Sequence, residues 1–432
     1  MSPVFAQFNL GIYVLATIAF FVDLFDVLLR LYLRREHTLP GDTRAIAPTS
    51  VPLDIGTFTP YESRLHLRPY AIVASIHNLD RASLDRFLDN MAPYRGHLWI
   101  IDDASTDDTW ERLQASGVPC MRGARNQKKP GAIKALLATL PESIDSIVVV
   151  DPDVRIVNSA TEFETVVFQF QRTGMGALCP RIAVRADGPL SRFQQLEYCF
   201  SFALGRKSLG DMTITSGIAI YRRDALERLL TRHSLSVYAE DLENAFLLLL
   251  DGDRVYYDGR IVAETEGMAD CRSLFSQRVG WNFGLIKVYA DYWRPLLGQC
   301  RRGFIFTYQY IVYTGVLTLA LHPLKFLGLV LLAISAMNGI DNLVRLHAIP
   351  DTPLTNPAYF VMMYLKYTAL VVAAFPLITP RSERRFILPV LPVYVFYGLA
   401  QVLPASVGYL NWVALRTWGQ RVYRDHYQEA AP

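Results

Sequence analysis

Cysteine and net charge are both scarce in this chain of 432 residues. The formal net charge is only +3, from 43 basic and 40 acidic residues, and no basic patch alternates with aromatic residues, so a nucleic-acid partner is not expected. The cysteines are odd in number and lack metal-like spacing, which argues against a disulfide framework and predicts free thiols facing a reducing cytoplasm. They are Cys120, Cys179, Cys199, Cys271 and Cys300.

Long apolar runs are abundant. Residues 8–33 are almost wholly apolar, and further runs follow from residue 304 onward. A bilayer core needs about 20 apolar helical residues, and several of these runs reach that length. No basic residue precedes the first run and no small-x-small site ends it, so we expect a membrane anchor and not a cleaved signal peptide. The sequence therefore predicts a multi-pass protein of the cell membrane, embedded in the lipid bilayer.

Basic residues beside the apolar runs predict the orientation. Clusters of arginines lie at 30–35, 301–302, 381–385 and 416–424. Because such clusters gather on the cytoplasmic side, the N-terminus is expected outside and the large insert inside. Within the first run, Asp26 is expected to pair with Arg30, four residues on.

This orientation determines the expected crossings. The block 304–337 must cross once, with its first half interfacial or steeply tilted and the crossing at about 324–340; residues 359–378 then cross inward. The last block is interrupted by Pro389, Pro392 and Pro404, which favours an in-plane or re-entrant segment. The predicted organisation is a transmembrane helix (8–33), a linker (34–66), a cytoplasmic domain (67–300), interfacial and transmembrane helices (301–415) and a cytoplasmic tail (416–432).

Within the cytoplasmic domain, short apolar runs alternate with helical patterns. "YAIVASIHN", "HLWIIDDAS" and "SIVVVDPDV" read as strands, whereas "RASLDRFLDNMAPY", "DDTWERLQAS" and "PGAIKALLATL" have helical spacing. Strands alternating with helices predict an α/β fold with a mostly parallel sheet covered on both faces. In such folds ligands bind at the carboxyl ends of the strands.

Acidic pairs follow two of these strands. Asp102 and Asp103 end one strand, and Asp151 and Asp153 end another. A single pair is readily explained as turn formers. Two pairs at the same edge of the sheet favour a site for a metal-bound nucleotide. Carboxylate oxygens suit Mg²⁺ or Mn²⁺, which bridge substrate phosphates.

A further acidic pair lies in "YAEDLENAF". Glu240 and Asp241 directly precede a predicted helix, where they could cap it and interact with its dipole. A carboxylate there could equally act as a general base toward an acceptor hydroxyl. The spacing is compatible with both roles.

The motifs "IDDASTDDT", "VDPDV", "TSGIAIYRRDAL", "AEDLENAFLLLLDGDRVYYDGRIVAETEG" and "SQRVGW" occur in order over residues 70–290. Together they resemble the processive branch of the family-two glycosyltransferases, which includes hyaluronan, chitin-oligosaccharide and cellulose synthases. The resemblance implies a GT-A domain between membrane helices. It further implies inverting transfer from a UDP-sugar donor to a growing polysaccharide, with Mg²⁺ or Mn²⁺ and with product passing through the membrane.

The resemblance also implies roles for the donor-side residues. Asp103, with Asp102, would contact the uridine. Lys129 would approach the nucleotide or its phosphates. Asp151 would reach the ribose side of the donor, and Asp153 would bind the metal.

On the acceptor side, the resemblance assigns Asp241 as the base that deprotonates the attacking hydroxyl. Ser216 and Gly217 would line the acceptor entrance, although an ordinary strand–turn segment explains them equally well. Gln277 and Trp281 would lie beneath the acceptor sugar, with the indole stacked on its apolar face.

Two departures from the family pattern stand out. The family motif Q-x-x-R-W has an arginine directly before its tryptophan, near the diphosphate, where this chain has Gly280. Arg278 lies about 200° around the helix from that position and is expected to point elsewhere, although it is the nearest candidate cation. The first strand offers His77 and Asn78 for the nucleotide, with Leu79 at the usual acidic position, so uridine recognition is expected to differ.

The tail segment "WGQR" resembles the W-G-T-R loop that closes over the nucleotide in hyaluronan synthases. Trp418 and Arg421 match two of its positions, and Gln420 replaces threonine. The alternative is a basic juxtamembrane tail with an interfacial tryptophan. We expect the gating role.

The sequence leaves three functions open. The first is the polysaccharide synthase. The second keeps the chemistry but adds one sugar to a lipid or short acceptor, and Gly280 favours it. The third is a catalytically idle membrane scaffold, against which the retained carboxylates argue.

Overall fold

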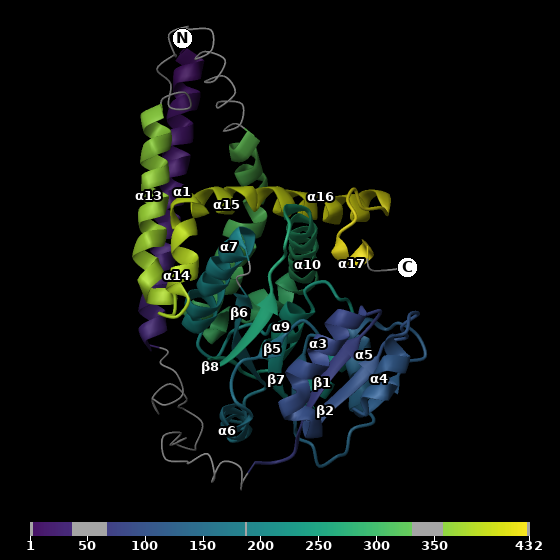
Figure 1. The fold of residues 1–432 in the computed structure, drawn as a ribbon. Coiled ribbons are helices and arrows are strands. Elements are labelled where there is room, and N and C mark those ends of the chain that lie inside the picture. Colours follow the sequence, from purple (N-terminus) through teal and green to yellow (C-terminus); the bar gives the residue numbers. More distant parts are fainter. Residues whose placement is uncertain (1–2, 37–66, 186–187, 331–356, 430–432) are drawn as a thin grey trace.

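The computed structural model describes residues 3–36, 67–185, 188–330 and 357–429. Almost all of the predicted linker, 34–66, and most of the predicted crossing at 324–340 lie outside these residues. The described chain forms an α/β domain beside a group of long apolar helices (Figure 1).

The domain is built on one mixed sheet with the strand order β3-β2-β1-β4-β7-β6-β8-β5. Strands β1, β2, β3 and β4 pair in parallel, as do β6 and β8, whereas β7 is antiparallel to both β4 and β6 and β5 is antiparallel to β8. The strands are β1 Tyr70–Ile76, β2 Leu98–Asp102, β3 Cys120–Arg122, β4 Ser146–Val150, β5 Arg155–Ile156, β6 Ala177–Arg185, β7 Ile218–Arg222 and β8 Val255–Glu266.

Helices cover both faces of this sheet because the strand side chains alternate. In β1, Ile72 and Ile76 join one apolar core with α3 and α6, whereas Val73 joins a second core with α5, α8 and α9. The domain helices are α3 Arg81–Met91, η1 Ala92–His97, α4 Thr109–Ser116, α5 Lys128–Leu137, α6 Ala160–Gln171, α7 Pro189–Tyr198, η2 Cys199–Arg206, α8 Arg223–Arg232, α9 Glu240–Leu250 and α10 Cys271–Gly298. The strands and helices expected from the six quoted patterns are therefore confirmed.

Local sequence signals explain where several helices begin. Asp80 accepts a hydrogen bond from the Ser83 amide and so caps α3. Ser159 and Glu162 form a reciprocal capping box at the start of α6. The left-handed Gly117, with φ of 68°, ends α4.

The apolar helices lie on one side of the domain. Helices α1 and α13 run side by side, and α15 and α16 run crosswise to them, over the end of α10 (Figure 1). Tyr367 of α13 donates a hydrogen bond to Asp23 of α1 (3.2 Å). The helices are α1 Pro3–Glu36, η3 Cys300–Arg302, α11 Phe304–Phe306, η4 Thr307–Ala320, α13 Pro357–Ile378, α14 Arg384–Ile387, η5 Leu388–Val393, α15 Tyr394–Ala400, α16 Val402–Trp418 and α17 His426–Glu429.

Three helical stretches of the described chain are long and apolar enough to cross a membrane: Phe304–Val330, Val361–Ile378 and Arg384–Trp418. Apolar side chains on these stretches point outward, with Leu365 56% and Phe396 58% exposed. Such exposure is costly in water and suggests membrane association. The orientation of each stretch relative to a bilayer stays a prediction.

The predicted pairing of Asp26 with Arg30 is confirmed, with 2.8 Å between the charged atoms. The pair is buried and joins three parts of the chain. Tyr308 of η4 donates to Asp26 (2.9 Å), and Arg30 lies 3.4 Å from the hydroxyl of Ser208, which follows η2. Helix α1 is thereby attached to the α/β domain through polar contacts.

Candidate functional site

One lysine at the start of α5 contacts both the carboxyl end of β4 and the first turn of α9. Lys129, the second residue of α5, places its Nζ 2.6 Å from Asp151 Oδ1 and 2.9 Å from Glu240 Oε1. Asp241 follows Glu240 in the first turn of α9. The structure thus brings together the carboxylates that follow β4 and those that begin α9, although these segments are about ninety residues apart in the sequence.

The turn before β7 makes room for this cluster. A Cβ on Gly217 would stand 2.6 Å from Asp151 Oδ2, so a side chain there would displace the carboxylate. The Asp151 amide donates to the Gly217 carbonyl (2.8 Å), and the Thr215 hydroxyl donates to the Asp241 carbonyl (2.8 Å). The Ser216 side chain is buried. Of the two residues predicted at the acceptor entrance, Gly217 therefore lies directly beside Asp151, whereas the Ser216 hydroxyl lies 3.4 Å from Cys179 Sγ.

Burial and mutual repulsion keep two of these carboxylates weakly acidic. Desolvation raises the pKa of Asp241 to about 6; Lys129 opposes this shift, and the charge of Glu240 adds to it. Desolvation likewise raises the pKa of Asp151 to about 7, with Lys129 opposing and Asp153 adding. A carboxylate with a raised pKa, next to a cation in a partly open site, is suited to accept a proton at neutral pH.

Asp153 is exposed and accepts a hydrogen bond from the Thr265 hydroxyl near the end of β8 (2.6 Å). No group of three or more His, Cys, Asp or Glu side chains among the described residues forms a closed metal site. The donor set still fits Mg²⁺ or Mn²⁺, because these cations use one or two carboxylates and take their remaining ligands from phosphates and water.

The ends of β1 and β2 lie next to each other because Ile76 pairs with Asp102. His77 Nδ1 lies 3.0 Å from the Asp103 carbonyl, and Asn78 Oδ1 accepts from the Thr106 amide (2.7 Å). The structure therefore groups His77, Asn78 and both carboxylates, as the sequence predicted, at the same edge as β4.

The two carboxylates of β2 differ in their surroundings. Asp102 is fully buried and lies 3.3 Å from the Ser105 amide and 3.4 Å from Arg122 Nε. Asp103 Oδ1 accepts from the Gln127 amide (2.8 Å), at the start of α5. Asp102 thus shapes the loop after β2, while Asp103 connects this loop to the segment that presents Lys129.

Helix α10 carries Gln277, Arg278 and Trp281. Arg278 is buried and donates to Glu197 of α7 (2.8 Å), which also accepts from Tyr397 of α15 (2.7 Å). Its guanidinium lies 4.0 Å from the centre of the Trp281 ring, and it donates to Gln277 (2.8 Å). Arg278 therefore joins α10 to α7 and α15 and covers one face of the indole, which leaves at most the other face of Trp281 for a sugar.

The tail places its two predicted gating residues differently. Trp418, the last residue of α16, is 73% exposed. Arg421 instead lies over the ring of Phe283 (3.9 Å) and pairs with Asp425 (3.0 Å), and its guanidinium donates to Tyr238, two residues before Glu240. Arg421 is thus near the cluster, whereas Trp418 is not packed against it.

Some residues of the site were not singled out from the sequence as ligands or contacts. The sequence pointed to Glu240 only as a neighbour of Asp241. Its contact with Lys129 joins residues far apart in the chain and had no signal in the sequence. Tyr427 has no motif signal at all, yet its ring lies 2.9 Å from the place where a Cβ on Gly280 would stand. Gly280, noted from the sequence as a missing arginine, therefore leaves the space on α10 in which the Tyr427 ring of the tail packs.

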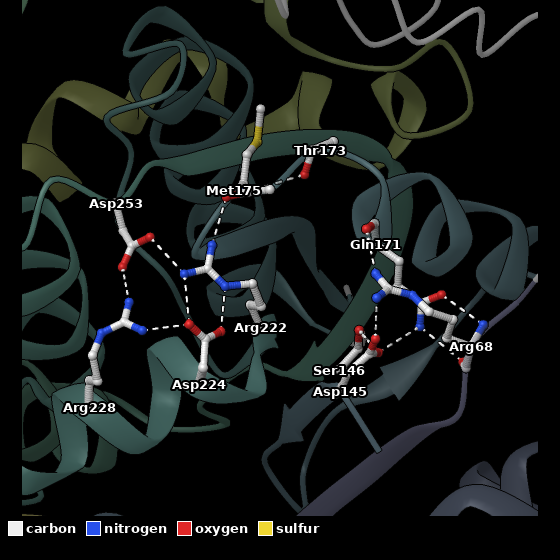
Figure 2. Close-up of polar contacts among 11 residues, drawn as sticks. Arg68, Asp145, Ser146, Gln171, Thr173, Met175, Arg222, Asp224, Arg228 and Asp253 are labelled. Carbon is white, nitrogen blue, oxygen red and sulfur yellow. Dashed lines mark hydrogen bonds and ion pairs between the residues drawn. The ribbon is translucent and has the colours of Figure 1, made fainter. Parts of the chain in front are cut away.

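A cavity of about 560 Å³ lies at the opposite end of β4, between Arg68, Asp145, Gln171 and Arg222. Figure 2 shows that its charged side chains are occupied with one another. Arg68 pairs with Asp145 (2.6 Å), and Arg222 pairs with Asp253 (3.2 Å). Because these charges neutralise each other, we interpret this cavity as a structural ion-pair region and not as the candidate site.

Comparisons with known proteins agree with this geometry. Residues 72–230, which run from β1 into α8, match the family model "Glycosyl transferase family 2". This stretch, which is less than half of the chain, is therefore similar to the family-two glycosyltransferases, and the predicted GT-A-like α/β fold is confirmed. The processive branch within the family stays a prediction.

One similar solved structure extends over almost the whole chain. The mannosyltransferase PcManGT from Pyrobaculum calidifontis, in complex with GDP-Man and Mn²⁺, has a TM-score of 0.55 and is 17% identical, and the match covers 92% of this chain and 97% of that one. Glucosyl-3-phosphoglycerate synthase from Mycobacterium tuberculosis, in complex with Mn²⁺, UDP and phosphoglyceric acid, is 19% identical over 54% of this chain and 82% of that one, with a TM-score of 0.37. The comparison with curated protein sequences gives no match.

Proposed function

We propose that this protein transfers a sugar from a nucleoside diphosphate sugar to a hydroxyl group of an acceptor at the cytoplasmic face of a membrane. The observation that carries the proposal is the contact of Lys129 with Asp151 and Glu240, beside Asp241, at the carboxyl end of the sheet of a family-two domain. This is the edge at which α/β folds bind their ligands.

The donor lies along the ends of β1, β2 and β4. Asp103, with the neighbouring His77 and Asn78, is at the nucleoside end, and Lys129 is close to the phosphates. Asp153 would hold Mg²⁺ or Mn²⁺, and its exposed carboxylate supports this assignment. The cation, when bound, neutralises the charge of the diphosphate and assists its departure.

Asp241 acts as the general base. It removes the proton of the acceptor hydroxyl, whose oxygen attacks the anomeric carbon and forms the new glycosidic bond. The bond between that carbon and the diphosphate oxygen breaks, and the nucleoside diphosphate leaves. The configuration at the anomeric carbon of the transferred sugar is inverted. Lys129 keeps Asp151 and Glu240 from repelling the negatively charged donor.

The identity of the donor and of the acceptor is supported by two separate observations, which favour different reactions. The motif resemblance favours a UDP-sugar donor and a growing polysaccharide as acceptor, with translocation through the membrane helices. The absence of an arginine at Gly280, where the Tyr427 ring packs instead, favours a single addition to a lipid or short acceptor. The likeness in fold to a mannosyltransferase in complex with GDP-Man adds GDP-sugars to the donors to be tested. Trp281 stacks on the acceptor sugar with the indole face that Arg278 does not cover, and Arg421 belongs to the tail segment that closes the nucleotide side; the exposed Trp418 directly precedes that segment.

A panel of donors tests the proposal. The full-length protein in nanodiscs is supplied with UDP- and GDP-sugars and with Mn²⁺ or Mg²⁺, and release of nucleoside diphosphate is measured. We expect metal-dependent release from at least one donor, and sizing of the radiolabelled product separates a polymer from a single addition. Metal-independent release, or none from any donor, would overturn the proposal.

The pH profile offers a more specific prediction. Because the pKa of Asp241 is raised to about 6, the base becomes protonated below that pH, so kcat/KM should fall on the acidic side. The charge of Glu240 contributes to this rise. Glu240→Gln should therefore move the acidic midpoint to lower pH, as measured from kcat/KM between pH 4.5 and 8. An unchanged or higher midpoint would contradict the assignment of Asp241.

A further inference from the structure

The chain after α16 folds back onto α10. Gly419, in the left-handed region with φ of 70°, reverses the chain direction. The fully buried Asn411 of α16 then holds the returning segment: its Oδ1 accepts from the amides of Val422 (3.0 Å) and Tyr423 (2.9 Å), and its Nδ2 donates to the Tyr423 carbonyl (2.9 Å). The segment that follows Gly419 is therefore held in a defined position against α16 by side-chain hydrogen bonds.

A buried carboxylate holds the last turn in place. Asp425 is fully buried and accepts hydrogen bonds from Tyr238 (2.9 Å), from Arg421 (3.0 Å) and from the amide of Tyr427 (3.1 Å). Tyr238 lies just before Ala239 and Glu240, so Asp425 attaches the tail directly to the segment that begins α9. A charge buried with this many partners indicates a specific arrangement.

Gly280 of α10 leaves room for the ring of Tyr427, the second residue after Asp425. A Cβ at Gly280 would come within 2.9 Å of Tyr427 Cδ2, so a larger residue would displace the ring, and within 3.3 Å of His426 Nδ1, which is a tight contact. The ring of Tyr427 also packs edge-on against Tyr238, with 4.9 Å between the ring centres. Tyr427 is therefore fixed between α10 and the start of α9.

The phenol of Tyr427 lies in the field of the candidate site. Burial raises its pKa well above the ordinary value, and the charges of Glu240, Asp151 and Asp241 add to this rise while Lys129 opposes it. The hydroxyl therefore keeps its proton at neutral pH and is able to donate a hydrogen bond. The nearby guanidinium groups are engaged elsewhere: Arg278 pairs with Glu197, and Arg421 pairs with Asp425.

We propose that Tyr427 is a donor-binding residue, whose hydroxyl donates a hydrogen bond to the diphosphate of the bound nucleotide sugar. This inference rests on the proposed function, because it assigns the Lys129 side of the site to the phosphates. Gly280 is then needed because only glycine leaves room for the ring. The tail completes the donor site and does not obstruct it.

The variant Tyr427→Phe tests this role, since it keeps the ring and removes only the hydroxyl. A hydrogen bond to a charged group contributes about 1.5–3 kcal/mol, so kcat/KM for the donor should fall by ~10- to 150-fold. The affinity for UDP or GDP in the presence of Mn²⁺, measured by calorimetry without turnover, should fall in the same direction. Tyr423→Phe, in the same segment but packed on Phe275, is the matched control and should bind and turn over as the wild type does.

Gly280→Ala provides an independent test that retains the hydroxyl. Its methyl group displaces the Tyr427 ring, so nucleotide affinity should fall as in Tyr427→Phe, while the melting temperature of the domain reports whether the fold is preserved. If Tyr427→Phe keeps the nucleotide affinity and the kcat of the wild type, the inference is overturned. A gain in kcat would also overturn it, because it would show that the tail obstructs the site. If the wild-type protein binds nucleotide but transfers no sugar, the proposed function fails while the binding comparison still decides the role of Tyr427.

Discussion

Asp241→Asn should lower sugar transfer by about 10²- to 10⁴-fold, which is the usual contribution of a general base. Asparagine has nearly the same shape but accepts no proton, so the acceptor hydroxyl would have to attack without deprotonation. Asp241 sits in the first turn of α9, and its backbone carbonyl, which accepts from Thr215, is unchanged by the substitution. The affinity for nucleotide and Mn²⁺ should therefore stay close to that of the wild type.

Asp251→Asn is the matched control, because Asp251 caps the other end of the same helix and pairs with Arg232. Release of nucleoside diphosphate is measured for both variants under saturating donor. We expect the loss only at position 241. Equal activity of Asp241→Asn and the wild type would show that another group takes the proton.

Asp153→Asn should produce the second large effect, about a 100-fold or greater loss of kcat/KM at low metal concentration. The substitution removes a charged oxygen ligand while the Thr265 hydroxyl can still donate to the amide oxygen. Because the weakened step is metal binding, rising Mn²⁺ concentration should restore part of the activity. The measurement is kcat/KM as a function of Mn²⁺ concentration.

Asp145→Asn serves as the control for this variant, since Asp145 directly precedes β4 whereas Asp153 follows it. Asp145 belongs to the ion pairs at the opposite edge of the sheet (Figure 2). Its substitution should affect stability and leave the metal dependence unchanged. A metal titration curve of Asp153→Asn that superimposes on the wild-type curve would remove Asp153 from the metal site.

The fold was predictable where local patterns determine it. The strands β1, β2 and β4 are short apolar runs followed by turn-forming polar residues, and the helices between them have clear apolar faces, so a parallel sheet followed from sequence alone. The antiparallel position of β7 between β4 and β6, and the short β5 at the edge, were not predicted. These pairings join segments far apart in the chain, and no local pattern encodes which strands become neighbours.

The candidate site was predictable from motifs to a similar extent. Lys129, Asp151 and Asp241 were proposed from separate motifs, and the structure adds the contacts by which Lys129 joins the segments of the two carboxylates. The role of the tail was not predictable, because Tyr427 lies in a stretch without periodicity or motif. The glycine at position 280 was recognised only as an absent arginine, and the ring that fills its place became apparent only from the packing of the tail on α10.

The central claim is that a metal-bound nucleotide sugar occupies the carboxyl edge of β1, β2 and β4. A structure of the full-length protein with Mn²⁺ and the nucleoside diphosphate of the accepted donor, with the manganese located by anomalous scattering, tests it most directly. We predict manganese at Asp153, with the diphosphate between Lys129 and Tyr427. Manganese away from Asp153, or a nucleotide in the cavity between Arg68 and Arg222, would contradict the account.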